Sequence, residues 1–133
     1  MTALVAVVQP LVDGWERGDF RSPPELLAPD LVVTGFTATG DDRAEGAEQI
    51  RAYLQQFFAE WRDYRIDAHR VVPLDDAHVL IEGRQWGIGR SSGLEIDETL
   101  FVIVAVKDEL VTRIHWHAHR EGAFRAAGLS EDD

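Results

Sequence analysis

The chain has 133 residues with 24 acidic and 13 basic side chains, which gives a net charge of −11 when the histidines are neutral. This length suffices for one domain with a hydrophobic core, and the excess of negative charge argues against partners such as nucleic acid or an anionic membrane. Because the sequence contains no cysteine, disulfide bonds and thiolate metal sites are excluded. The N-terminal segment lacks the basic start of a signal peptide, and the longest apolar run, residues 100–106, is too short to cross a bilayer, so we expect a cytoplasmic protein.

Helical patterns dominate the first half of the chain. Leu4, Val8, Leu11 and Trp15 recur at helical spacing, which predicts a helix from Thr2 to about Gly18, with Pro10 off the apolar stripe. The segment "SPPE" predicts the start of a short second helix. The next segments predict a strand over residues 31–37, a polar loop, and a long amphipathic helix over residues 46–62.

The second half changes to the two-residue repeat of strands. Apolar and polar residues alternate over 64–72, and short turns then separate three further strands, over residues 78–88, 94–106 and 110–119. Consecutive strands with short turns predict an antiparallel meander. The run "LFVIVAV" does not alternate, which is typical of a central strand covered on both faces. A short helix ending at Gly128 follows, and residues 129–133 form an acidic tail.

These elements predict a single α+β domain over residues 1–133, in which a strongly curved antiparallel sheet wraps round the N-terminal and middle helices. The chain resembles the nuclear-transport-factor-2-like superfamily, and within it the SnoaL-like group. The segments that carry this resemblance are "WERGDF", "LLAPDLVVTG", "EGAEQIRAYLQQF", "GRSSGLEID" and "KDELVTRIHWHAHREGAFRAAGL". The resemblance implies a cystatin-like α+β cone with an internal pocket, and it implies no single activity, because function does not follow from fold.

Members of this superfamily include ketosteroid isomerases, polyketide cyclases and epoxide hydrolases, and the chain can be compared with each. In the isomerase pattern, the catalytic base would fall on Gly35 and the tyrosine of the oxyanion hole on Leu11, which argues against that mechanism. Only Asp97 matches an expected polar residue of the isomerases. The pair His115–Trp116 resembles a pair in the cyclases, whereas Asp97 and Arg84 supply two members of the Asp-Arg-Asp set of the hydrolases.

The segment "RIHWHAHR" places His115, His117 and His119 at alternate positions. On a strand these side chains share one face, with neighbours about 6.6 Å apart. Two of them could bind one metal ion, but a zinc site would need a further ligand from another strand, so we expect no metal and no cofactor. Two interpretations stay open: the histidines pack in a polar environment, or one acts as an acid or base near neutral pH.

The resemblance implies that Arg113, His115 and His117 point into the cone, whereas Ile114 and Trp116 lie on the outer face. The candidate ligand-binding residues are Glu82, Arg84, Trp86, Thr99, Phe101, Arg113 and Trp15. Read structurally, Glu82, Arg84 and Trp86 would supply a cross-strand ion pair with a tryptophan buried at an interface, Asp97 would be a neutral donor or a salt-bridge partner of Arg84 or Arg113, and Trp15 would pack in the core.

Three functions are consistent with these residues. The first is an enzyme that acts on a small, largely apolar molecule by cofactor-free proton transfer, using His117 with the assistance of Asp97 and His115. The second is a protein that binds such a molecule in the same pocket without chemistry. The third is a structural homodimer. In all three cases we expect a homodimer through the outer sheet face, including Ile114 and Trp116.

Overall fold

The computed structural model describes residues 3–17, 26–34, 43–46, 48–50, 52 and 59–129. In chain order, the elements are α1 (Ala3–Glu16), β1 (Leu27–Thr34), β2 (Arg43–Glu45), β3 (Trp61–Pro73), β4 (His78–Gly89), β5 (Glu95–Lys107), β6 (Leu110–His117) and α3 (Arg120–Ala126). The helix predicted at "SPPE", most of the helix predicted over residues 46–62 and the end of the acidic tail lie outside the described residues.

Helix α1 has the apolar stripe that its sequence predicts. Val8, Leu11 and Trp15 are buried, whereas Pro10 is exposed and lies inside the helix without ending it. A proline on the solvent side of a helix loses one backbone hydrogen bond but disturbs no core contact. The stripe therefore positions the helix against the sheet.

The six strands form one mixed sheet in the order β2-β1-β6-β5-β4-β3. The predicted antiparallel meander is confirmed over β3 to β6. Strand β1 pairs in parallel with β6, and this pairing makes the sheet mixed. Strand β2 falls in the predicted polar loop. Its three residues are too few to show an alternating pattern, so the sequence does not predict it, and its pairing with β1 defines it as a strand.

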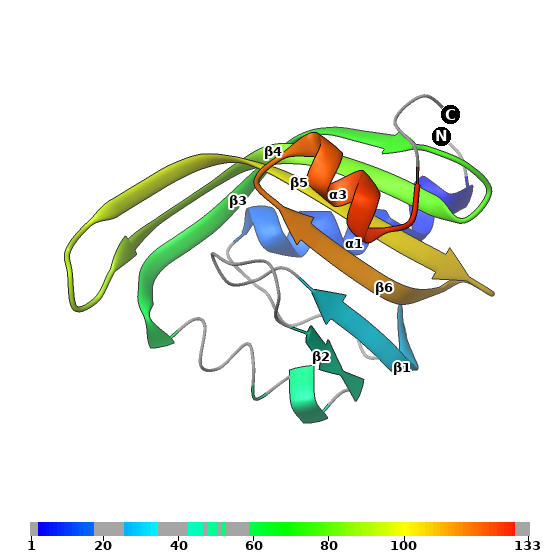
Figure 1. Ribbon diagram of the computed structural model, residues 1–133, viewed down its shortest axis with the longest axis horizontal. Helices are drawn as coiled ribbons and strands as arrows, with labels where there is room; N and C mark the ends of the chain where they lie inside the picture. Colours follow the sequence, from blue (N-terminus) through cyan, green and yellow to red (C-terminus); the bar gives the residue numbers. More distant parts are fainter. Residues whose placement is uncertain are drawn as a thin grey trace.

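The sheet curves round α1, and α1 and α3 lie on opposite faces of it (Figure 1). We call these faces the α1 face and the α3 face. The α1 face holds the larger hydrophobic cluster, which includes Val8, Trp15, Ile81, Val102 and Trp116. The α3 face holds a smaller cluster of Leu80, Ile103, Ala123 and Phe124. Strand β5 contributes to both clusters, which confirms that "LFVIVAV" is a central strand covered on both sides.

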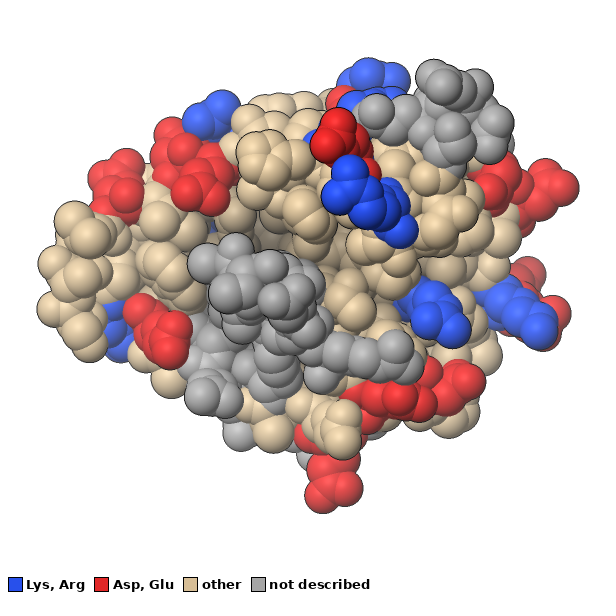
Figure 2. All heavy atoms as spheres, in the orientation of Figure 1, with Lys and Arg blue, Asp and Glu red and all other residues tan. Residues whose placement is uncertain are grey.

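In the described part of the chain, no helix is both long enough and apolar enough to span a membrane. Acidic side chains gather round the edge of the molecule in the view of Figure 2, and basic side chains are fewer there.

Candidate functional site

Strand β6 turns its side chains in the direction opposite to the one predicted. Ile114 and Trp116 are each only 5% exposed and belong to the cluster on the α1 face, where the Trp116 ring lies 4.8 Å from the ring of Trp15. His115 and His117, at alternate positions, therefore lie on the α3 face. The prediction that the histidines point into the cone is wrong, and so is the assignment of Ile114 and Trp116 to an outer interface. The apolar residues take the side on which α1 buries them.

His115 is buried on the α3 face and is 6% exposed. Its Nδ1 lies 2.9 Å from the hydroxyl oxygen of Thr34, which strand β1 brings alongside by the parallel pairing of Thr34 with His115. Burial lowers the pKa of His115 to about 4, and the nearby charges of Arg113 and His78 act in the same direction. Its imidazole is therefore neutral at pH 7.

His117 lies beneath helix α3. A Cβ placed on Gly122 would come within 2.1 Å of the His117 ring, so only glycine leaves room for the imidazole there. The Nδ1 of His117 accepts a hydrogen bond of 3.4 Å from the backbone N–H of His119, and His119 itself is exposed. Phe101 pairs with His117 in the register and packs against the α3-face cluster. This position makes His117 part of the contact between α3 and the sheet.

Asp97 lies far from the histidines. It pairs with Trp86, whereas His117 pairs with Phe101, four residues further along β5, which corresponds to about 13 Å along the strand. Instead, Asp97 accepts a hydrogen bond of 2.8 Å from Nε of Arg84, and both side chains are about half exposed. Asp97 therefore makes no contact with His117 through which it could assist proton transfer. The acid–base roles of His117, His115 and Asp97 stay predictions.

The other predicted binding residues of strands β4 and β5 also lie on the α3 face. Glu82 pairs with Arg70 on strand β3 and with Arg120 on helix α3, and Arg84 pairs with Asp97 on strand β5, so the expected cross-strand ion pairing forms. Trp86 donates from its indole nitrogen to Glu95 at 2.7 Å, beneath the guanidinium of Arg65. Thr99 is exposed opposite Arg84. Arg113 is exposed on β6, and Trp15 is a core residue of the α1 face.

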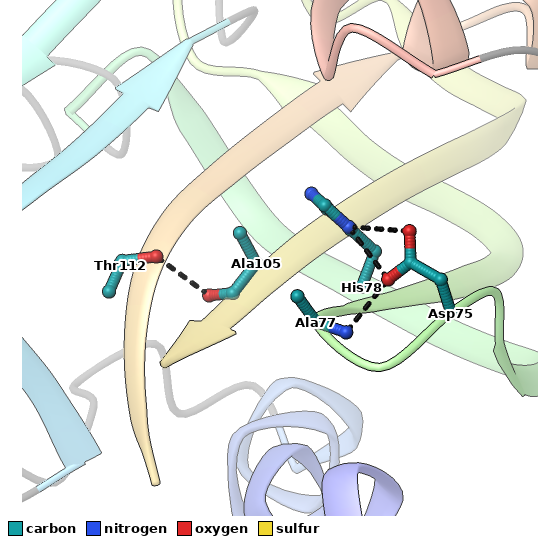
Figure 3. A network of polar contacts seen from close by, with 5 residues as sticks. All are labelled: Asp75, Ala77, His78, Ala105 and Thr112. Carbon is teal, nitrogen blue, oxygen red and sulfur yellow. Dashed lines mark hydrogen bonds and ion pairs between the residues drawn. The ribbon is translucent and has the colours of Figure 1, made fainter. Parts of the chain in front are cut away.

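The structure adds a polar pair on the α3 face that the sequence analysis missed. Nδ1 of His78 lies 2.9 and 3.0 Å from the two carboxylate oxygens of Asp75, which also accepts a hydrogen bond from the backbone N–H of Ala77 (Figure 3). Although burial alone would raise the pKa of Asp75, these hydrogen bonds and the His78 charge lower it below its ordinary value. Asp75 lies in the short turn between β3 and β4, and its spacing to His78 was the available signal.

A second missed set lies on the α1 face, near the start of β3. Tyr64 is 8% exposed and donates a hydrogen bond of 2.6 Å to the side-chain oxygen of Gln85. Gln85 pairs directly with Glu98 on the neighbouring strand. Burial raises the pKa of Tyr64 above its ordinary value, and the negative charge of Glu98 adds to this effect. Because Glu82, Arg84 and Trp86 share one face, the alternation itself placed Gln85 on the other.

The side chains near Tyr64 on the α1 face are aromatic and apolar. The Trp61 ring lies 6.4 Å from the Tyr64 ring, and Gly87 lets the Tyr64 ring approach its strand, since a Cβ there would come within 3.1 Å of the ring. Ile66 and Leu100 are buried on the same face. Over the described residues, no three His, Asp or Glu side chains come close enough together to hold a metal ion.

Solved structures show the same fold. A protein with a ketosteroid isomerase-like fold from Catenulispora acidiphila, in complex with trimethylamine, is 18% identical with a TM-score of 0.69, over 96% of this chain and 95% of its own. A protein from Jannaschia sp. CCS1, named for a SnoaL-like polyketide cyclase, is 19% identical with a TM-score of 0.72, over 85% and 83%. TerC, co-crystallised with polyporic acid, is 13% identical with a TM-score of 0.71, over 89% and 92%.

No curated protein matches the sequence. The sequence pattern of the SnoaL-like domain, in contrast, matches residues 8–128. This range includes most of α1, the whole sheet and α3. The chain therefore belongs to the SnoaL-like domain family.

Proposed function

We propose that the protein binds a small, largely apolar molecule on the α1 face of the sheet, where Tyr64, Gln85 and Glu98 meet. The observation that carries this proposal is the hydrogen bond of 2.6 Å from the buried Tyr64 hydroxyl to Gln85, within aromatic and aliphatic walls. Ligand sites typically combine apolar walls with a few polar groups that fix the orientation of the ligand. Tyr64 and Gln85 are suited to this role, since the phenol oxygen can accept a hydrogen bond while its O–H donates to Gln85, and the amide nitrogen of Gln85 can donate one.

Small molecules in complex with proteins of similar fold support the proposal that the ligand is small. The Catenulispora acidiphila protein holds trimethylamine, and TerC was crystallised with polyporic acid. Both are small molecules, but they differ greatly in chemistry, so the polar groups of this chain must select its ligand. Here those groups are a phenol, an amide and a carboxylate on one face.

The probe 2-naphthol, an apolar aromatic with one hydroxyl, tests this proposal. Calorimetry should give saturable binding, and NMR should show that the side-chain amide of Gln85 shifts during the titration. Tyr64→Phe should weaken binding about fivefold, because one hydrogen bond contributes about 1 kcal/mol. Thr99→Val removes a hydroxyl from the α3 face and should leave the affinity unchanged. Equal loss in both variants, or no saturable binding, would refute the site.

Proton transfer at the same site is a second candidate function. It is favoured by the direct pairing of Gln85 with Glu98, which places a carboxylate beside a phenol whose pKa is raised. The side-chain amide nitrogen of Gln85, whose oxygen accepts from Tyr64, would donate a hydrogen bond to a substrate carbonyl, while Glu98 would remove a proton from the adjacent carbon.

Deuterium exchange at the α-carbon of 2-tetralone, a small apolar ketone, measures this activity. We expect Glu98→Gln to abolish enzyme-dependent exchange, whereas His117→Ala and Asp97→Asn, on the opposite face, should retain it. If His117→Ala abolished exchange and Glu98→Gln did not, the acid–base role predicted for His117 would replace this proposal.

We also propose a homodimer through the part of the α3 face that helix α3 leaves exposed. Arg84 and Asp97 lie on this surface, which we call the open part of the α3 face, together with Arg65, Asp67, Trp86 and Thr99. Both signs of charge occur on one surface, so a two-fold axis can place a basic group of one copy against an acidic group of the other. Light scattering after size exclusion should give twice the monomer mass, and Trp86→Glu should reduce it to the monomer; an unchanged mass would exclude this interface.

A further inference from the structure

Three groups that can carry positive charge or donate hydrogen bonds lie together on the α3 face. Ala105 on β5 pairs with His78 on β4 on one side and with Arg113 on β6 on the other. His78 and Arg113 therefore flank a small side chain, with their backbones about 10 Å apart. His115 follows two residues after Arg113 on the same strand and the same face. The side chain of Ala105 is short, and the side chains of His78 and Arg113 on either side of it are longer.

His78 is held in a fixed orientation by Asp75. In Figure 3 its Nδ1 faces the carboxylate, and the other ring nitrogen points away from Asp75. A carboxylate only accepts hydrogen bonds, so Nδ1 carries a proton, and Nε2 becomes a second donor when the imidazole is protonated.

Arg113, like Arg62 and Arg65 on β3, forms no ion pair with a described carboxylate, in contrast to other arginines of the sheet and α3. Arg70, Arg84 and Arg120 each form an ion pair with a carboxylate. None of the ion pairs between described residues includes Arg113, although the chain carries a net charge of −11. An exposed guanidinium that forms no ion pair with a described carboxylate, in so acidic a protein, is available for an anion from solution.

His115 is the third of these groups and can supply a hydrogen-bond donor. When the Thr34 hydroxyl donates to Nδ1, the neutral ring carries its proton on Nε2, which can then donate to a ligand. The groups round His115 are thus Thr34 on β1, Arg113 on its own strand and His78 on β4, with Asp75 behind His78.

We propose that Arg113, His78 and His115 form a binding site for a small oxyanion, a phosphate or carboxylate group, over Ala105 on the α3 face. The guanidinium supplies two parallel donors that match a carboxylate or phosphate. His115 supplies one donor from Nε2, and His78 supplies a second from its Nε2 when its imidazole is protonated. This site is separate from the proposed ligand site on the α1 face, so either can fail without the other.

Inorganic phosphate is the first probe, with NMR of the histidine ring protons at constant ionic strength maintained with sodium chloride. We expect the signals of His78 and His115 to shift with one saturable curve, while those of His69, on the distant part of β3, stay in place. Bound phosphate should also raise the pKa of His115, since a negative charge nearby favours its protonated form. Acetate in a parallel titration distinguishes a carboxylate ligand from a phosphate ligand, and saturation by either one supports the proposal.

Arg113→Gln is the decisive variant, because its exposed side chain can be replaced without disturbing the core. It should weaken binding about tenfold, which corresponds to the loss of a charge-assisted contact. Arg125→Gln is the matched control on helix α3, and it should bind as the unmodified chain does. A linear, non-saturating drift with both anions, or equal affinity in the two variants, would overturn the proposal.

Discussion

At the scale of single residues, the burial of His115 makes the stability of the fold depend on pH. Its pKa is lowered to about 4 in the folded chain, against an ordinary value near 6.5. Between these values the unfolded chain binds a proton that the folded chain does not. The contribution of His115 to stability is therefore present above about pH 6.5, and it is lost as the pH falls through about 4.

We expect His115→Gln to remove this part of the pH dependence. Urea unfolding of the unmodified chain should show a fall in the free energy of unfolding of at most about 3 kcal/mol between pH 6.5 and pH 4 that the variant lacks. The difference between the two curves isolates His115 from the carboxylates, because both chains contain the same acidic residues. Parallel curves would show that His115 titrates normally in the folded chain.

Gly122 gives a second prediction at the scale of residues. Gly122→Ala places a Cβ within 2.1 Å of the His117 ring, so the imidazole must move out and its contact with α3 is lost. We expect a destabilisation of about 1–2 kcal/mol in thermal unfolding. In a chain that carries His117→Ala, the same glycine change should cost much less, because the ring is absent; an equal cost in both backgrounds would locate the strain elsewhere.

At the scale of elements, α1 and α3 stabilise the two faces of the sheet very unequally. Helix α1 covers the large cluster and packs Trp15 against Trp116, whereas α3 packs its Ala123 and Phe124 against two buried residues of the sheet and adds the ion pair of Arg120 with Glu82. The α1 face therefore dominates the stability, and the α3 face is the one where polar side chains are tolerated.

Because α1 covers more of the core than α3 does, we expect two tryptophan substitutions to lower the free energy of unfolding by different amounts. Trp15→Ala removes a buried ring from the α1 face and should cost about 3–5 kcal/mol. Trp86→Ala, on the open part of the α3 face, should cost about 1 kcal/mol in the monomer, since Trp86 is only partly buried. Where Trp15→Ala does not fold, Trp15→Phe provides the measurable variant. Similar losses at both positions would contradict the assignment of the main core to the α1 face.

At the scale of the whole molecule, the net charge of −11 opposes the compact state. Like charges on a folded surface repel one another, and salt screens this repulsion over about 10 Å at 0.1 M. The ion pairs between described residues lie between exposed or partly exposed side chains, so salt that screens them lowers the stability only slightly.

We therefore expect the melting temperature at pH 7 to rise by about 3 °C between 10 and 150 mM sodium chloride. A variant with Asp63→Asn and Asp108→Asn should respond less, because it carries two fewer negative charges; both positions have positive φ, which asparagine tolerates. A melting temperature that falls with salt would show that ion pairs outweigh the repulsion.

Local patterns in the sequence were sufficient for most of the elements. The stripe of α1, the meander β3 to β6, the central position of β5 and the final helix are all confirmed, because each depends on periodic burial within one segment. The mixed pairing of β1 with β6 and the strand β2 were not predicted, since they depend on contacts between distant segments.

Tertiary packing determines which face of the sheet lies inside and which residues meet there. Alternation shows that His115 and Trp116 point in opposite directions, but α1 decides that the tryptophan is in the core. Register across β4 and β5 likewise decides that Asp97 meets Arg84 rather than His117, and that Gln85 lies beside Glu98. The sequence alone therefore determined the elements and the family fold, whereas long-range packing determined the candidate sites, because pairing between strands depends on residues far apart in the chain.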